Sequence, residues 1–175
     1  IRNGAKQLVI TSRNATKDRV DDLFSAAYRG SALVQAVAAD ISREEDVDRL
    51  FEHIRADLPP LKGVVHSAGI LDDGILARLN WKRFAPLFEP RVYGSWLLHE
   101  QTKSMELDFF FLNSSLLSVL GSAGQANYTS SSAFIDGLAA YRRSRGLPAV
   151  SVNWCAWSDG GLATVSGARG QEMWS

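Results

Sequence analysis

Short apolar runs rich in β-forming residues alternate along this chain with segments of helical period, and this alternation strongly constrains the fold. The β-rich runs cover residues 8–11, 33–39, 63–67, 108–113 and 149–154. Apolar residues at helical spacing occupy residues 17–28, 42–58, 80–102 and 128–145. Strands that alternate with helices in this way are joined by right-handed crossovers. The sequence therefore predicts an α/β fold: one doubly wound parallel sheet with helices on both faces.

Local signals predict details of two of these elements. Ser42 followed by Glu45 is the spacing of a capping box, so a helix is expected to begin after Ser42. Pro59 and Pro60 end that helix. The run 108–113 is almost continuously aromatic and apolar, which predicts a strand buried on both faces.

Composition excludes several classes of protein. The 175 residues, with 46% hydrophobic and 22% charged residues, are typical of one globular domain. Nineteen basic and nineteen acidic residues cancel, so neither a nucleic-acid partner nor a basic membrane-binding face is expected. No apolar run approaches the roughly 18 residues that a membrane span needs. Three scattered histidines and one cysteine predict no metal site and no internal disulfide, which favours a reducing, cytoplasmic compartment.

Polar residues stand just past the predicted strands, where doubly wound sheets bind their ligands. These candidate positions are Ser12, Arg13, Asp40, 67–69, Ser115 and the stretch after Val152.

Two of the candidates suggest acid catalysis. Ser115 ends the fourth predicted strand, and Tyr128 begins the helix that follows. A serine hydroxyl can hold a substrate carbonyl by a hydrogen bond while a tyrosine hydroxyl gives that oxygen a proton. A free tyrosine titrates near pH ~10, so such a site needs a cation beside the tyrosine.

Five segments carry a resemblance to a known family: LVITSRN, AADIS, GVVHSAGILDDG, FFFLNSSLLSVLGSAGQANY and GLPAVSVNW. In this order and spacing, the chain resembles the catalytic subdomain of ketoreductase domains of modular polyketide synthases. These domains are a branch of the short-chain dehydrogenase/reductase superfamily with a Rossmann-like fold. The segments span nearly the whole chain, and HSAGILDDG followed by GSAGQANY is the most specific part.

The resemblance implies NADPH-dependent reduction of a β-ketoacyl thioester. The partners it implies are an acyl carrier protein, which holds the substrate on phosphopantetheine, and the other domains of the same synthase. In this interpretation Ser115 holds the ketone and Tyr128 protonates its oxygen.

The resemblance also assigns cofactor positions. Ser12 and Arg13 match the residues that select the 2′-phosphate of NADPH. Asp40, with Ile41 after it, matches the position beside the adenine. The segment Ser67-Ala68-Gly69 matches the tight turn beside the nicotinamide ribose.

A further motif concerns stereochemistry. Leu71-Asp72-Asp73 matches the motif of B-type ketoreductases, which form the D-configured alcohol. The tryptophan that marks A-type enzymes is absent, because Leu120 stands at its position. From the residues alone, at least one of the two aspartates is expected to lie in a solvated turn.

Three departures from the family predict an impaired or lost reductase. Arg91 stands at the position of the catalytic lysine, and Ser132 at that of the asparagine four residues after the tyrosine. Cys155 replaces a glycine between two tryptophans. Arginine does not substitute freely for lysine where a compact donor is needed. Arg91 is therefore either a residual catalytic cation or a structural arginine paired with a carboxylate. The alternative function is a folded pseudo-ketoreductase that no longer turns over. His66, in a buried strand, is expected to be a core residue.

The family's glycine-rich first turn precedes LVITSRN and is not among these residues. We therefore expect a gap, or a strand from another segment, between the strands at 8–11 and 63–67, and 175 residues that form part of a longer polypeptide. Residues 163–175 are expected to form a lid or tail.

Overall fold

The computed structural model describes residues 4–23 and 32–156, so the predicted lid at 163–175 lies outside the described residues. The chain divides into two compact units, residues 1–59 and residues 60–175.

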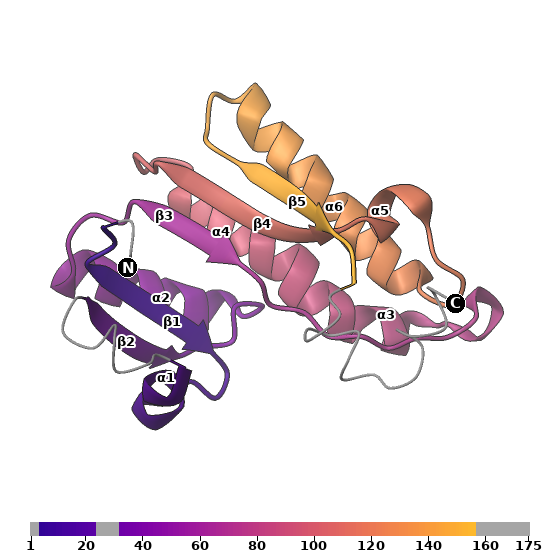
Figure 1. Cartoon of the computed structure of the whole chain (residues 1–175), viewed down its shortest axis with the longest axis horizontal. Helices are drawn as coiled ribbons and strands as arrows, with labels where there is room; N and C mark the ends of the chain where they lie inside the picture. Colours follow the sequence, from indigo (N-terminus) through magenta and orange to yellow (C-terminus); the bar gives the residue numbers. More distant parts are fainter. Residues whose placement is uncertain (1–3, 24–31, 157–175) are drawn as a thin grey trace. The chain divides into compact units, whose positions relative to one another are not determined.

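The first unit is a parallel strand pair covered by a helix. Strands β1 (Gln7–Ser12) and β2 (Leu33–Ala38) pair in parallel, from Gln7 opposite Leu33 to Ser12 opposite Ala38. Helix α1 (Lys17–Leu23) follows β1, and helix α2 (Glu44–Asp57) lies along one face of the pair (Figure 1). The buried stripe of α2 forms the core of this unit: Val47, Leu50, Phe51 and Ile54.

The predicted capping box at the start of α2 is wrong. The residue at the N-cap is Arg43, and no side chain caps it. The hydroxyl of Ser42 instead donates to the carboxylate of Asp40 at 2.6 Å. The neighbouring carboxylate therefore takes the hydroxyl that sequence reasoning assigned to the helix end.

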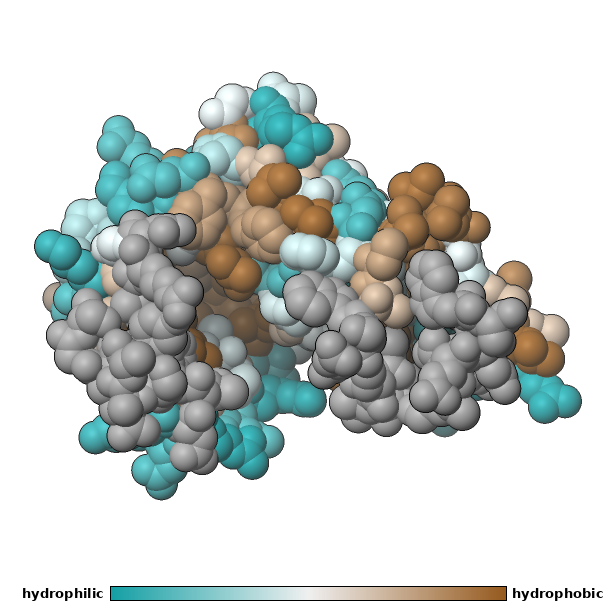
Figure 2. Space-filling model, viewed as in Figure 1, coloured by the Kyte–Doolittle hydropathy of each residue, from teal (hydrophilic) through white to brown (hydrophobic). Residues whose placement is uncertain are grey.

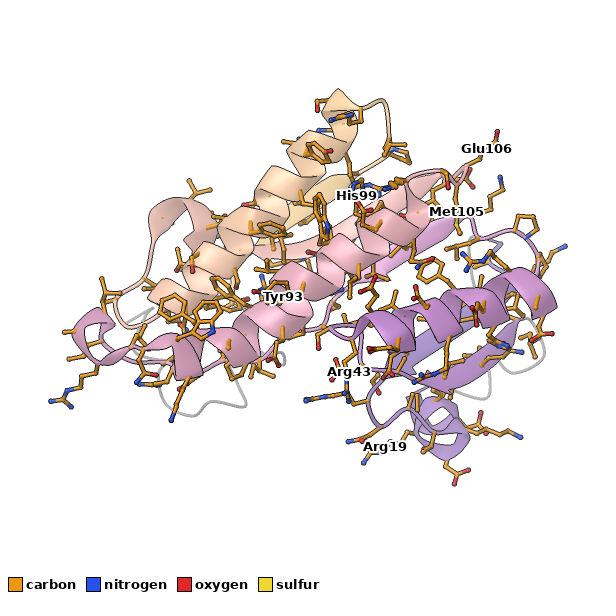
Figure 3. The ribbon with its side chains drawn as sticks, turned by 180° about the vertical axis from the view of Figure 1, so that it is seen from behind. Arg19, Arg43, Tyr93, His99, Met105 and Glu106 are labelled. Carbon is orange, nitrogen blue, oxygen red and sulfur yellow. The ribbon has the colours of Figure 1, made fainter. Side chains whose placement is uncertain are left out.

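The second unit is a three-stranded parallel sheet under a layer of helices. The strand order is β3 (Gly63–His66), β4 (Phe109–Ser115) and β5 (Val150–Trp154), with β4 in the centre. Helices α4 (Gly94–Thr102) and α6 (Ala126–Ser144) cover the same face of this sheet (Figures 1 and 3). The smaller elements are η2 (Leu76–Arg78), α3 (Trp81–Phe88) and α5 (Leu117–Leu120).

The helix predicted over residues 80–102 is divided by a π-helical turn. This turn, η3 (Glu89–Tyr93), joins α3 to α4. Pro90 lies in it and cannot donate a backbone hydrogen bond, which favours a departure from the regular α-helical pattern. Arg91 is buried in the widened turn, whereas Tyr93 lies on the outer side of the helical layer and is 48% exposed (Figure 3). Such π turns occur frequently at functional sites.

Strand β4 is fully buried on one face only. Phe110 and Leu112 face the helices and are completely buried, whereas Phe109 is 48% exposed. The prediction of burial on both faces is therefore wrong for Phe109 among the described residues.

All strand pairs are parallel, as the sequence predicted, but they form two hydrogen-bonded sheets instead of one. Strands β1 and β3 do not pair with each other, as the sequence predicted. Within the part of the chain that the structure describes, no helix has the length and apolar character needed to cross a membrane.

The core of the second unit contains a buried arginine. Arg142 of α6 is completely buried, and its guanidinium lies 3.9 Å from the ring centroid of Phe110. It donates to Thr102 of α4 and to the carbonyl of Pro148, and its Nη1 lies 3.0 Å from Nδ1 of His99. Burial and the charge of Arg142 lower the pKa of His99, so the neutral imidazole accepts this bond. Arg142 thus connects two helices, the central strand and the turn before β5.

Candidate active site

Ser115 and Tyr128 lie at the carboxyl end of the central strand and in the first turn of α6. Ser115 is 6% exposed, and its Oγ accepts the backbone N–H of Leu117 at 3.2 Å. This bond uses a lone pair of the hydroxyl and leaves its hydrogen free to be donated. Ser115 can therefore hold a carbonyl oxygen while α5, which begins at Leu117, fixes its position.

A hydrogen-bonded group that the sequence did not reveal supports the end of β4. Asn153 of β5 donates to the carboxylate of Asp136 at 2.9 Å and to the carbonyl of Ser115 at 3.1 Å. Ser118 donates to the same carboxylate at 2.5 Å. Burial raises the pKa of Asp136, but the hydrogen bonds from Ser118 and Asn153 outweigh it, so the pKa lies below its usual value. The ionised Asp136 thus holds together the ends of β4 and β5.

A buried cation, Arg91, lies beside Tyr128. Its guanidinium carbon lies 4.6 Å from the ring centroid of Tyr128, and the residue is 4% exposed. Its Nε donates to Ser131 at 3.0 Å and its Nη2 donates to Ser132 at 2.8 Å. Among the described residues, hydroxyls rather than a carboxylate accept these bonds of Arg91. Burial lowers the pKa of Arg91, while Tyr128 and Asp136 oppose this effect.

The two serines also bind the tyrosine backbone. Ser131 and Ser132 both donate to the carbonyl of Tyr128, at 2.8 Å and 2.9 Å. Ser132 was a candidate from its sequence position, whereas Ser131 was not. Only its spacing of three residues from Tyr128 on a helix could have indicated it.

The turn after β3 approaches Arg91 closely. A Cβ atom placed on Gly69 would lie 3.2 Å from Nη1 of Arg91, so glycine at this position leaves space for the guanidinium. Ser67 is exposed and Ala68 is half-buried in the same turn. His66, directly before the turn, is 3% exposed, as the sequence predicted.

The loop around the two aspartates is bonded to two helices. Arg83 of α3 donates through Nε to Asp72 at 2.8 Å and through Nη2 to the carbonyl of Asp73 at 2.6 Å. Gln125 donates to the carboxylate of Asp73 at 3.0 Å, and Asn127 donates to the carbonyl of Asp72 at 2.8 Å. The hydrogen bond from Arg83 lowers the pKa of Asp72. The side chain of Asp72 is thus hydrogen-bonded while 38% of it stays exposed, and the half-buried Leu71 precedes this turn.

In the first unit, basic residues surround Asp40. Ser12 and Arg13 are exposed at the end of β1, and Ile41 is 8% exposed. Burial raises the pKa of Asp40, but hydrogen bonds from Ser42 and the charges of Arg13 and Arg43 outweigh it and lower the pKa. Arg43 and Arg19 extend from the same side of this unit (Figure 3). The charges of these arginines make the end of β1 a candidate site for an anion.

Two other positions singled out from the sequence are exposed. Cys155 follows β5 and is a free, exposed thiol. Leu120, where A-type enzymes carry tryptophan, is 70% exposed on α5, and Figure 2 shows apolar atoms gathered over this helix.

The parallel strands, the strand-end serine and the tyrosine beside a buried cation together define an α/β domain with the layout of a short-chain reductase. The sequence profile described as "KR domain" matches residues 1–159, so the chain belongs to the ketoreductase domain family of polyketide synthases.

Relatives agree with this assignment. The chain is 35% identical over 168 residues to the phenolphthiocerol synthesis polyketide synthase type I Pks15/1 of Mycobacterium marinum, covering 95% of this chain and 8% of that synthase. It is 44% identical over 137 residues to the spectinabilin polyketide synthase system protein NorB of Streptomyces orinoci, covering 78% of this chain and 6% of that protein. The chain thus spans less than a tenth of the length of these relatives.

A solved structure agrees as well. An A-type ketoreductase from a modular polyketide synthase superposes with a TM-score of 0.85 at 36% identity, covering 93% of this chain and 34% of that one.

Proposed function

We propose that this chain is most of the catalytic subdomain of a ketoreductase that reduces a β-ketoacyl thioester with NADPH. The observation that carries the proposal is the buried guanidinium of Arg91, 4.6 Å from the ring centroid of Tyr128. In a chain of this family, a cation beside this tyrosine is what proton donation at neutral pH requires.

The residues of the site have distinct roles in this reaction. The hydroxyl of Ser115 donates a hydrogen bond to the ketone oxygen and orients the carbonyl. Tyr128 transfers its phenolic proton to that oxygen, so that its O–H bond breaks as the O–H bond of the alcohol forms. The charge of Arg91 then stabilises the tyrosinate until a proton returns from solvent.

The residues present fit NADPH in charge. The 2′-phosphate is a dianion, and the exposed Arg13 and Ser12 at the end of β1 would hold it. Asp40 and Ile41 would lie beside the adenine, and Ser67, Ala68 and Gly69 beside the ribose of the nicotinamide. When bound, NADPH supplies the hydride that reduces the carbonyl carbon.

We further propose the remaining parts of the assignment. The substrate is carried on the phosphopantetheine of an acyl carrier protein, within a cytoplasmic synthase that contains other domains. Leu71, Asp72 and Asp73 direct the B-type outcome, which is the D-configured alcohol. The anchoring of this loop to α3 and α6 supports a role in guiding the substrate.

The reaction is expected to be slow. Two N–H groups of Arg91 already donate to serines, and the guanidinium that they fix in place does not offer a ribose hydroxyl the compact, rotatable ammonium of a lysine. Losing a well-placed donor typically costs roughly 10²–10³ in rate. The same observation favours the second candidate function, a pseudo-ketoreductase that binds its neighbours without turnover. Cys155 adds a side chain near the end of β5 and acts in the same direction.

One experiment separates the two candidates. The full-length protein is assayed for NADPH oxidation with a β-ketoacyl thioester, the product is resolved by chiral chromatography, and NADPH binding is measured by fluorescence. We expect slow turnover to the D-alcohol, and Tyr128→Phe should lower kcat about 10²–10⁴-fold while NADPH still binds. Tyr141→Phe, an exposed tyrosine of the same helix, is the matched control. NADPH binding without any turnover would establish the pseudo-ketoreductase instead.

A further inference from the structure

We infer that Ser131 and Ser132 form a clamp that positions the guanidinium of Arg91, and that Arg91 and Ser132 therefore depend on each other. The inference rests on the proposed function only in taking Arg91 as the cation of the site. Ser131 is assigned here as a positioning residue, because it acts on the reaction through Arg91.

The geometry of the clamp matches a guanidinium and not an ammonium. Nε and Nη2 belong to one rigid planar group, and each donates to a different serine, at 3.0 Å and 2.8 Å. Consecutive residues of α6 thus present two acceptors to one fork of donors. A lysine ammonium is a single point on a flexible stem and has no such planar fork.

The hydroxyl hydrogens of the clamp are already used. Both serines donate to the carbonyl of Tyr128, at 2.8 Å and 2.9 Å. A hydroxyl has one hydrogen, so its remaining lone pairs are available as acceptors toward Arg91. The backbone of Tyr128 therefore orients the clamp, and the clamp holds the cation against the ring of the same tyrosine.

Burial makes the clamp costly to break. Arg91 is 4% exposed, and Ser131 and Ser132 are completely buried. Water has little access to replace a lost acceptor, so the guanidinium would keep an unsatisfied donor. A Cβ atom at position 69 would crowd Nη1 of Arg91 from 3.2 Å, so glycine there also helps to accommodate the guanidinium.

Size couples position 132 to position 91. Asparagine has two more heavy atoms than serine beyond the Cβ–Oγ pair, and Nη2 of Arg91 lies only 2.8 Å from Oγ of Ser132. Asparagine at 132 would therefore collide with the guanidinium. Lysine at 91 would leave two serine hydroxyls facing a shorter donor. Either replacement alone disrupts the hydrogen bonds between residues 91 and 132. The two replacements together substitute a lysine–asparagine pair for the arginine–serine pair.

A double-mutant cycle in the full-length protein tests this coupling. Arg91→Lys, Ser132→Asn and their combination are compared by hydrogen–deuterium exchange of peptides from α6 and by kcat. We expect each single variant to exchange about fivefold faster or more. The combined variant should exchange within about twofold of the natural protein and turn over about tenfold faster than either single variant. The inference would be overturned if the effects of the two single variants on exchange in α6 simply added in the combined variant. It would also be overturned if Arg91→Lys alone gave the slow exchange and the higher kcat expected of the combined variant.

Ser131→Ala supplies a milder test that does not risk misfolding by a clash. It should speed exchange in α6 when Arg91 is present and have little effect in the Arg91→Lys background. Ser130→Ala is the matched control, because exposed Ser130 makes the same kind of bond, to the carbonyl of Asn127 at 2.9 Å, without touching Arg91. Equal effects of the two alanine variants would contradict the clamp. Exchange measurements do not depend on turnover, so an inactive protein would refute the proposed reaction and leave this test intact.

Discussion

At the scale of single residues, the surroundings of His66 disfavour its protonated form, so its imidazole is neutral. Burial, followed by the charge of Arg91, lowers its pKa from 6.5 to about 4, against a hydrogen bond with the backbone of Pro90. Among the described residues its Nε2 has no hydrogen-bond partner. The imidazole therefore packs well only without a second proton.

This lowered pKa predicts a loss of stability in mild acid. Below pH 6.5 the unfolded chain binds a proton at His66, whereas the folded chain does not until about pH 4. The free energy of unfolding should therefore fall by about 1.4 kcal/mol for each pH unit in this window. Urea denaturation followed by tryptophan fluorescence, at pH values from 7 to 4, measures the slope.

The variant His66→Asn tests the assignment, because an amide can still donate to the carbonyl of Pro90 and does not titrate. It should flatten the pH dependence, leaving the smaller contribution of His99, whose pKa is lowered in the same direction. An equally steep slope in this variant would show that another group is responsible.

At the scale of elements, Arg83 fastens the loop of Asp72 and Asp73 to α3. Its guanidinium bridges the carboxylate of Asp72 and the carbonyl of Asp73, and Asn127 binds the loop from α6. The carboxylate is 38% exposed, so solvent screens the ion pair and the pair adds little to the stability of the fold. Its effect is therefore local: it sets where the loop lies.

Arg83→Ala should loosen this loop without unfolding the unit. We expect peptides containing residues 71–79 to exchange hydrogen about fivefold faster, with α6 unchanged. The fraction of D-alcohol should fall, since the loop is proposed to guide the substrate. Arg83→Lys keeps the charge but lacks the planar pair of donors. Its exchange rate and its fraction of D-alcohol should therefore lie between those of the natural protein and those of Arg83→Ala.

The control for this element is Lys82→Ala, an exposed neighbour on α3. It should leave both exchange and product configuration as they are. If Arg83→Ala changes exchange but not the product, then the loop does not direct stereochemistry.

At the level of elements, part of the fold and of the candidate site could be predicted from the sequence. The strand positions were predictable because buried parallel strands need continuous apolar runs. The candidate positions Ser115 and Arg91 followed from strand ends and motif spacing. The contacts of Arg91 with Ser131 and of Arg83 with Asp72 join segments separated by tens of residues or by a loop, and no local pattern encodes them. The cap at Ser42 failed for a related reason, since a competing acceptor lay two residues away.

At the scale of the whole molecule, we expect Arg142 to contribute strongly to the stability of the second unit. It connects α4, α6, β4 and the turn before β5 from a completely buried position. Arg142→Ala should lower the free energy of unfolding by about 3–5 kcal/mol, through the cavity and through the orphaned groups of its partners. The urea midpoint of the full-length protein measures this loss.

Arg143→Ala is the matched control, because this neighbour is exposed and donates to the carbonyl of Ala149. It should change the free energy of unfolding by no more than about 0.5 kcal/mol. A comparable loss of unfolding free energy in both variants would show that the positive charge of α6, and not the buried contacts of Arg142, is responsible.

The π-helical turn η3 also determines where the chain tolerates insertions and deletions. A π turn holds one residue more than an α-helical turn, and one residue corresponds to a rotation of about 100° around the helix axis. Deleting a residue between Glu89 and Tyr93 would merge α3 and α4 into one continuous helix. Because the residue removed is the extra one of the π turn, the buried face of α4, with Leu98 and Thr102, would keep its orientation, and Trp96 would stay exposed. A codon lost within α4 itself would turn every later residue of that helix by about 100°, whereas a codon lost in the π turn is absorbed there.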